Sequence, residues 1–362
     1  MGKSSITVVT NQTSPYQVEF MDAVARENEF DLRVIYLYSQ RPGRQWTPPA
    51  ITHSHRILDG QPARLEEARS WILESDLVVI GYYQDPYAAE LLRERVKSEQ
   101  AWCFWGERMG VTRMAWAGAL YRRWKLRGLH RSRAAIWGIG EFALERYRRE
   151  FGSRRVYCNV PYFSNLSRFL SPTPRVFSGD ERRILYSGSL IERKGVDVLA
   201  QAFRKVSRQC NNLRLTFLGE GPLKANLERD LKECADRVSF AGFKDWSELP
   251  VFYHQAHILC VPSRHDGWGL VVPEGLASGL PVIGTTRTGA ALELIKPNYN
   301  GWLVEAGNVQ QMADALETVS RFSKEQMAQC SAAAIASVAN HSLAAGVSRF
   351  KEAVAATLAA WS

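Results

Sequence analysis

The segment 261–285, VPSRHDGWGLVVPEGLASGLPVIGT, contains the side chains best suited to bind a ligand or to act in catalysis. Asp266 precedes a Gly-Trp-Gly run at 267–269, and Glu274 stands eight residues after Asp266. Glycines let backbone N–H groups approach a ligand closely, and N–H groups at a helix start attract anions. Carboxylates beside an anion site suit a ligand with both phosphates and hydroxyls, such as a nucleotide sugar. The alternative is that both acids lie on a solvent-facing side of a helix.

A second candidate site is the segment YSGSLIERKG at residues 186–195. Its pattern predicts the end of a strand, a glycine turn and the start of a helix near Asp197. Arg193 and Lys194 stand just before that helix start. Lys and Arg supply the positive charge that a pyrophosphate needs. An exposed charged loop is the alternative interpretation.

With these motifs the chain resembles the retaining glycosyltransferases of family 4 (glycosyl transferases group 1). The family pattern runs Pro-Ser, two variable residues, Glu-Gly-Phe-Gly-Leu, three residues, Glu-Ala and then Gly-x-Pro-Val. Here Asp266 replaces the first Glu, Trp268 replaces Phe and Gly275 replaces Ala, while order and spacing are kept. The resemblance is specific from Ile184 to Val304 and loose over the first half of the chain.

The resemblance implies a donor site in the second half of the chain. Glu274 would bind the donor ribose, and Lys194 and Asp266 would be catalytic. The residues expected at the donor diphosphate are Gly188, Ser189, Arg193, Lys194, Gly269 and Leu270; at the donor sugar, Asp266, Gly267 and Trp268; at the nucleobase, Gly242 and Phe243. Ser189 stands where many members carry Arg, and we expect Arg193 to compensate for that missing charge.

The first half would bind the acceptor. The candidate acceptor residues are Asn11, Gln12 and Thr13 after the first expected strand, and Glu107 at the end of a later one. Many family members place a His near the donor sugar, for which this chain has no obvious counterpart. Glu107 is therefore the best first-domain candidate for a catalytic contact to donor or acceptor sugar.

Short β-rich runs alternate with helical patterns, which predicts an α/β fold with parallel sheets. The resemblance implies the GT-B fold, two Rossmann-like parallel-sheet domains facing across a cleft. We expect an acceptor-binding domain at 1–165, a linker at 166–180, a nucleotide-sugar domain at 181–340 and a final helix at 341–362 packing back on the first domain. Residues 40–62, rich in Pro, Gly and Arg, are expected to form a long loop.

Positive charge is concentrated in one region. Residues 108–155 hold thirteen Lys or Arg against three Glu, a balance of +10, whereas the whole chain has a net charge of +9. Within it, residues 112–133 combine aromatic and apolar residues at helical spacing with basic residues crowded into the second half, Arg122, Arg123, Lys125 and Arg127 among them. This pattern is typical of helices that lie on an anionic membrane surface. The alternatives are a basic helix packed on its own domain and, more distantly, a nucleic-acid surface, although no nucleic-acid motif accompanies the charge.

Other features exclude common classes of site. No Asp-x-Asp pair is present to hold a divalent ion, so we expect no metal and no cofactor apart from a UDP- or GDP-linked sugar as co-substrate. His254 and His257 find no third ligand, and the Gly-x-Gly-x-x-Ala run at 138–143 lacks the acidic ribose partner of a dinucleotide site. The six cysteines are scattered, and no signal or membrane-spanning run is evident, which predicts a cytoplasmic protein, peripheral on the inner face of the membrane if 112–133 binds lipid.

The leading functional hypothesis is a retaining, metal-independent hexosyltransferase that acts on a glycan or lipid-linked acceptor in bacterial-type polysaccharide synthesis. Two alternatives stay open. One is a transferase with a soluble small-molecule acceptor, and the other is a non-catalytic scaffold that binds a nucleotide sugar.

Overall fold

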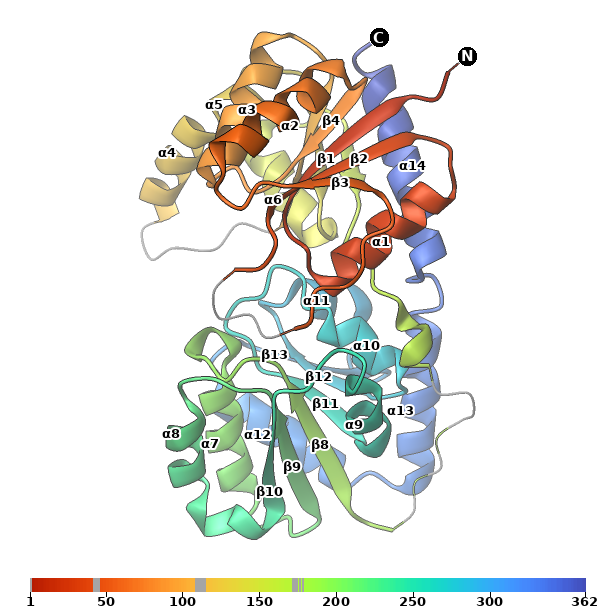
Figure 1. Ribbon diagram of the computed structural model, residues 1–362. Helices are drawn as coiled ribbons and strands as arrows, with labels where there is room; N and C mark the ends of the chain where they lie inside the picture. The colour runs from red at the N-terminus through yellow and green to blue at the C-terminus, as the bar shows by residue number, and fades with distance from the viewer. Residues whose placement is uncertain (1, 42–45, 108–114, 171–174, 176, 178) are drawn as a thin grey trace. The chain divides into compact units, whose positions relative to one another are not determined.

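The computed structural model describes residues 2–41, 46–107, 115–170, 175, 177 and 179–362 of the chain. The chain divides into two compact units (Figure 1). Unit 1 comprises Met1–Asn165 and Leu343–Ser362, and unit 2 comprises Leu166–Ser342. Each unit is a parallel β-sheet with helices packed against it, so the predicted α/β class is confirmed.

Unit 1 contains a seven-stranded sheet in the order β3-β2-β1-β4-β5-β6-β7, with every neighbouring pair parallel. The strands are β1 (Ser5–Gln12), β2 (Asp31–Tyr38), β3 (Ser54–Ile57), β4 (Leu77–Ile80), β5 (Trp102–Gly106), β6 (Ala135–Gly138) and β7 (Tyr157–Asn159). Its central strands are continuous apolar runs because both faces are covered. The strand order reverses between β1 and β4, so the carboxyl ends of these two strands flank a topological switch point.

The helices of unit 1 include the C-terminal helix of the chain. They are α1 (Pro15–Arg26), α2 (Pro62–Glu74), α3 (Pro86–Lys97), α4 (Ala115–Lys125), α5 (Arg127–His130), α6 (Glu141–Phe151) and α14 (Leu343–Ala359). Helix α14 packs along α1, as Figure 1 shows in blue and red. Helices α2 and α3 contact each other, and residues from both join the apolar core on one face of the sheet.

Unit 2 contains a six-stranded sheet in the order β10-β9-β8-β11-β12-β13, again entirely parallel. The strands are β8 (Arg182–Ser187), β9 (Leu213–Leu218), β10 (Val238–Gly242), β11 (Ile258–Val261), β12 (Val282–Thr285) and β13 (Gly301–Val304). Because β8 lies beside β11, the loops that follow these two strands emerge next to each other at the carboxyl edge of the sheet.

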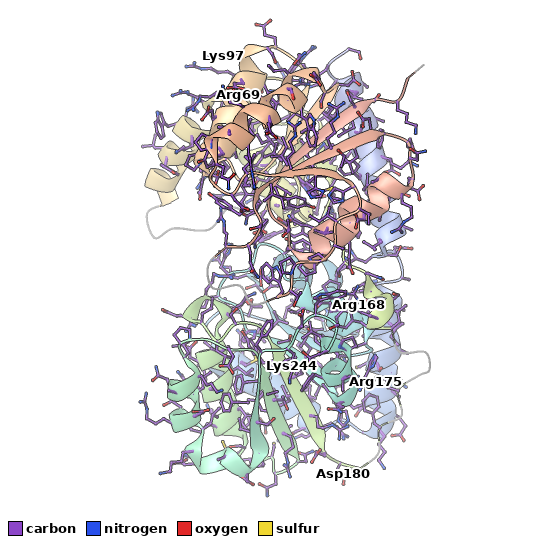
Figure 2. All side chains as sticks on the ribbon, viewed as in Figure 1. Arg69, Lys97, Arg168, Arg175, Asp180 and Lys244 are labelled. Carbon is purple, nitrogen blue, oxygen red and sulfur yellow. The ribbon has the colours of Figure 1, made fainter. Side chains whose placement is uncertain are left out.

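Helices cover the unit 2 sheet. They are α7 (Val196–Val206), α8 (Lys224–Asp230), α9 (Leu249–Gln255), α10 (Val271–Ala277), α11 (Gly289–Leu294), α12 (Val309–Ser320) and α13 (Lys324–Ser337), with three 3-10 turns, η1 (Leu166–Arg168), η2 (Glu192–Lys194) and η3 (Lys232–Arg237). Helix α7 packs against α12, and α10 packs against α13. Arg175, labelled in Figure 2, donates from its guanidinium to the carbonyls of His254, Ala256 and Ser278 within this unit.

Several expected elements differ from the observed ones. The predicted loop at 40–62 is wrong in its second half, where β3 pairs with β2. The single helix expected at 112–133 is instead two helices, α4 and α5, interrupted at Leu126, while residues 112–114 lie outside the described part. His254 lies in α9, whereas His257 follows the end of this helix. Within the described residues, no helix has the length and apolarity needed to cross a bilayer.

Candidate active site

The centre of the candidate site is an ion pair between Lys194 and Asp266. The Lys194 Nζ atom lies 2.5 Å from Asp266 Oδ2, and the two side chains are 19% and 13% exposed. Lys194 ends η2, after β8, and Asp266 lies in the loop after β11. The structure thus brings together two residues that the sequence assigned separately to diphosphate and donor sugar.

Burial and charge act in opposite directions on Asp266. Burial alone would raise the pKa of this carboxyl, but the charge and hydrogen bond of Lys194, with Arg193 and His265, outweigh it and lower the pKa below 3.8. Asp266 is therefore a carboxylate at neutral pH, and it accepts hydrogen bonds without donating any.

A close backbone approach fixes Lys194 next to the Asp266 loop. Gly195, at φ +66°, follows Lys194, and a Cβ atom at this position would lie 2.0 Å from the carbonyl oxygen of Pro262. Arg264 adds a second tie, donating two 2.6 Å hydrogen bonds to the carboxylate of Asp197 in the first turn of α7. Bidentate pairs of this kind fix orientation as well as distance.

The backbone of Asp266 is held from the other side by the start of α11. Its N–H donates to the carbonyl of Arg287 at 3.0 Å, and its carbonyl accepts from the N–H of Gly289 at 3.2 Å. Gly269, at φ +90°, lies so close to Thr288 that a Cβ would meet the Thr288 methyl carbon at 2.8 Å. The loop is consequently rigid at both the acid and the second glycine.

Gly269 and Leu270, where the sequence predicts an anion site, lie at the N-terminus of α10. In the part of the chain that the structure describes, neither N–H group donates a hydrogen bond to another backbone group. Leu270 is the N-cap of α10, which has only seven residues although the apolar run continues to Leu280. Such a short helix has few aligned peptide dipoles, so these N–H groups would act mainly as individual hydrogen-bond donors.

Glu274 lies in the first turn of α10, and its carboxylate has a partner that the sequence did not reveal. The Tyr253 hydroxyl donates to Glu274 Oε2 at 3.2 Å. Tyr253 is fully buried; burial and then the Glu274 charge raise its pKa well above its usual value, so it remains a donor. The contact fixes one Glu274 oxygen.

Trp268 is buried instead of being exposed toward a ligand. Its side chain is 1% exposed and stacks on the ring of His341, with centroids 5.7 Å apart and planes at 24°. The indole ring therefore packs inside unit 2 and helps to hold the loop in place. A donor-sugar contact by Trp268 remains a prediction for its backbone only.

The residues of the β8 loop that were expected to bind the diphosphate follow the carboxyl end of β8. Gly188 adopts φ +149°, its N–H bonds to the Leu218 carbonyl, and the Ser189 carbonyl accepts from the Tyr186 hydroxyl at 2.7 Å. The guanidinium of Arg193 donates to the His265 carbonyl at 2.9 Å. Arg193 thus lies beside the Asp266 loop.

The expected nucleobase residues follow β10. The Gly242 carbonyl accepts from the Gly219 N–H at 2.8 Å, and Phe243 is 39% exposed. Nearby in sequence, Trp246 stacks under Arg168, whose guanidinium carbon lies 4.0 Å from the ring centroid; Arg168 and Lys244 are labelled in Figure 2. This loop offers backbone groups and an aromatic surface to a ligand.

In unit 1 the expected acceptor residues have different environments. Gln12 and Thr13 are buried and hold neighbouring loops: Gln12 Oε1 accepts from the Arg41 N–H, and the Thr13 hydroxyl donates to the Ser39 carbonyl. Asn11 is partly exposed. Glu107 follows β5, is exposed, and its carbonyl accepts from the Tyr147 hydroxyl at 2.6 Å.

Histidines and glycines outside this region have structural explanations. His254 Nε2 lies 3.1 Å from the Phe169 carbonyl, and His257 is buried against Arg183. Among the described residues, no group of three or more His, Cys, Asp or Glu is placed to hold a metal ion. At Gly138 a Cβ would lie 2.5 Å from the Leu144 side chain, so close strand–helix packing explains the glycine.

The basic helix exposes the apolar residues that the sequence placed on one side. Leu120, Tyr121 and Trp124 of α4 are 60%, 46% and 59% exposed. The Lys125 Nζ atom lies 5.2 Å from the Trp124 ring. Arg122 is an exception, since it is buried and paired with Glu150 at 3.2 Å.

Known proteins match the part of the chain that holds this candidate site. Residues 171–336 match the family model described as "Glycosyl transferases group 1". The GDP-mannose-dependent alpha-(1-6)-phosphatidylinositol monomannoside mannosyltransferase of Mycobacterium tuberculosis is 31% identical over 147 residues, 38% of each chain. The amylovoran biosynthesis glycosyltransferase AmsK of Erwinia amylovora is 33% identical over 150 residues, 38% of this chain and 36% of that one.

These matches span about 38% of the relatives' length. For the fold, Anabaena Alr3699/HepE in complex with UDP and glucose has a TM-score of 0.74 at 12% identity, covering 98% of this chain and 100% of that one. The expected GT-B type, with two Rossmann-like parallel-sheet domains, is thereby confirmed as the fold. The sequence match and the fold together make residues 171–336 of this chain similar to the glycosyl transferases group 1 family.

Proposed function

We propose that this protein is a retaining, metal-independent glycosyltransferase. It would move a hexose from a UDP- or GDP-linked donor to a glycan or lipid-linked acceptor in the synthesis of a bacterial-type polysaccharide or glycolipid. The matching family domain supports the transferase class. The names of the two relatives, which concern a phosphatidylinositol mannoside and amylovoran, support the acceptor class.

One observation carries the proposal: the contact of Lys194 with Asp266 beside the N–H groups of Gly269 and Leu270. A cation and backbone donors suit a diphosphate, whereas a neighbouring carboxylate suits a sugar hydroxyl. These groups belong to two loops that the close approach at Gly195 and the Arg264–Asp197 pair hold together, so contacts within the fold fix the arrangement.

The proposed roles follow from the chemistry of each group. Lys194 and Arg193 would bind the diphosphate and offset the negative charge that grows on it as the glycosidic bond breaks. Asp266 would accept a hydrogen bond from a donor-sugar hydroxyl. Glu274, oriented by Tyr253, would accept from the ribose hydroxyls.

Metal independence is inferred from the sequence, where no Asp-x-Asp pair is available. Retention is inferred from the family resemblance. In the proposed front-face exchange, the acceptor hydroxyl attacks the anomeric carbon on the side of the leaving group, and its proton passes to the departing phosphate. The carbon–oxygen bond to the diphosphate breaks as the bond to the acceptor oxygen forms.

The exposed apolar and basic face of α4 supports a lipid-linked acceptor. Leu120, Tyr121 and Trp124 would enter the interface of a bilayer, with Arg123, Lys125 and Arg127 toward anionic headgroups. This surface would hold the enzyme on the cytoplasmic side of a membrane, close to an acceptor carried by lipid.

A panel of UDP- and GDP-linked hexoses in EDTA tests the donor site. We expect one donor to raise the melting temperature and to be hydrolysed slowly in the absence of an acceptor. Lys194→Ala and Arg193→Ala should weaken that donor at least tenfold, whereas Arg208→Ala, which removes an exposed pair with Glu233, should not. If no donor shifts the melting temperature, the proposal is wrong. A donor that binds without being cleaved would favour a non-catalytic scaffold.

A further inference from the structure

Unit 1 gathers a group of side chains at the point where its strand order reverses. Asn11 lies near the end of β1, Tyr82 follows β4, and Glu107 follows β5. Tyr16 in the first turn of α1 and Tyr162 after β7 complete the group. Open parallel sheets bind ligands outside the carboxyl ends of the strands, at such a switch point.

The backbone of Tyr82 is unusual. It adopts φ +54°, a region that bulky side chains rarely occupy. The other described non-glycine residues with positive φ are Asn, Asp and Glu, so Tyr82 is the aromatic one among them. Such conformations persist where the surroundings fix them, and they concentrate at ligand sites. The surrounding fold therefore holds Tyr82 in a backbone conformation that tyrosine does not favour, and this fixes the position of its ring.

The group combines aromatic faces with polar atoms. The rings of Tyr16 and Tyr162 have centroids 5.1 Å apart at 59°. Burial, and then the charges of neighbours that include Glu107, raises the pKa values of Tyr16, Tyr82 and Tyr162. At neutral pH all three phenols thus keep their protons, and Glu107 supplies the negative charge facing them.

Two atoms in the group suit a ligand that carries hydroxyls. The Asn11 Oδ1 atom is buried, and no described residue donates a hydrogen bond to it. Such an acceptor is costly unless a ligand or water supplies a donor. Glu107 is exposed, so the group is open to solvent on that side.

We propose that Asn11, Tyr16, Tyr82, Tyr162 and Glu107 form a subsite for one sugar ring of the acceptor. The identification of the ligand as a sugar rests on the proposed function. The partly exposed rings of Tyr16 and Tyr82 offer apolar faces to the C–H groups of a pyranose, and the buried Tyr162 ring packs against Tyr16. The phenols, the amide and the carboxylate match the hydroxyls of the sugar. Glu107 would hold an acceptor hydroxyl by a charge-assisted hydrogen bond.

The test uses full-length protein without donor and a panel of methyl glycosides of glucose, mannose, galactose and N-acetylglucosamine. Saturation-transfer NMR measures binding directly, without any turnover. A single sugar ring of this size should bind with a dissociation constant on the order of 1 mM. Glu107→Gln should weaken it roughly 10–100-fold, and Tyr82→Phe, which keeps the ring, roughly 3–10-fold.

The matched control is Tyr157→Phe, which removes a phenol that donates to the Gly152 carbonyl away from this group. It should bind glycosides like the wild type. All variants should melt within a few degrees of the wild type. If the wild type binds no glycoside, or if both subsite variants bind as well as Tyr157→Phe, the subsite is refuted. Donor hydrolysis without glycoside binding would refute the subsite alone, and glycoside binding without any donor effect would refute the transferase alone.

Discussion

Lys194 would have two anionic partners in the proposed reaction, the Asp266 carboxylate and the donor diphosphate. In this structure its ammonium group lies 2.5 Å from the Asp266 carboxylate, largely away from solvent. An ammonium group has three donors, so it can bind a phosphate oxygen while keeping one bond to the carboxylate. Asp266 would then position the cation in the free protein and the sugar in the complex.

Replacing Lys194 should therefore destabilise the protein as well as weaken donor binding. Lys194→Met keeps the aliphatic stem but leaves the Asp266 carboxylate buried without its main countercharge. We expect a loss of up to about 3–5 kcal/mol in the free energy of unfolding, measured by urea denaturation at pH 7. The double variant Lys194→Met/Asp266→Asn should recover part of that loss, because the uncompensated charge is gone.

The control for this pair is Lys351→Met, which removes an exposed pair with Glu29 and should have a much smaller effect. Equal losses in Lys194→Met and in the control, or a double variant no more stable than the single one, would contradict the role of Asp266 as the buried partner. Because the pKa of Asp266 is lowered, the contribution of the pair is present above pH 3.8 and is lost as the pH falls below that value.

Spacing along the chain predicted the types of side chain in the candidate site but not their contact partners. Lys194 and Asp266 are separated by 72 positions, and Arg264 and Asp197 by 67. Their contacts depend on the adjacency of β8 and β11, which no local pattern encodes. Tyr253 likewise reads as an ordinary apolar position of a short helix, although its hydroxyl orients Glu274.

At the scale of elements, apolar runs predicted the buried strands because both of their faces are covered. Strand β3 was missed because its sequence, SHRI, is polar and half-exposed at the edge of the sheet. Helix α10 is shorter than its apolar run because the chain turns at Gly279, which has φ +71°. The residues of this run are apolar because neighbouring elements bury them, and the run therefore does not mark the length of the helix.

The junction of α9 and β11 yields a pH-dependent prediction. Burial, followed by the charges of Arg183, Arg175 and Arg182, lowers the pKa of His257 from 6.5 to about 4. The folded state therefore binds fewer protons than the unfolded state between these values, so stability that is present above pH 6.5 is lost as the pH falls toward 4. The loss amounts to at most about 3 kcal/mol.

Unfolding by urea at pH 7.5, 5.5 and 4.5 measures this effect. His257→Gln has no titrating ring, and its amide can still accept from Arg183. We expect this variant to be less stable than the wild type at pH 7.5 and to lose less stability on acidification. Parallel pH profiles for the two proteins would show that His257 does not titrate in this range.

For the chain as a whole, the fold and the motifs of unit 2 could be predicted from the sequence, whereas the tyrosine group of unit 1 could not. The motifs of unit 2 concern backbone turns and charges, which the sequence shows directly. The tyrosine group of unit 1 comes from four separate segments of the chain, and only the sheet order brings its members to one edge. The basic segment was visible as composition, but only the structure shows that Leu120, Tyr121 and Trp124 are exposed while Arg122 is paired internally.

That exposed surface predicts binding to anionic membranes. Full-length protein should co-sediment with vesicles of phosphatidylglycerol and phosphatidylcholine but not with phosphatidylcholine alone, because basic side chains contribute about 1 kcal/mol each near an anionic surface. Raising the salt from 0.15 to 0.5 M should release most of the protein, since screening shortens the range of this attraction. Trp124→Ala should lower the partition coefficient at least about tenfold through lost apolar burial.

Tyr299→Ala, which removes an aromatic side chain of similar exposure in unit 2, is the matched control and should bind like the wild type. Equal binding by Trp124→Ala and this control would assign the attraction to net charge instead of α4, and the acceptor would then be sought among soluble glycans.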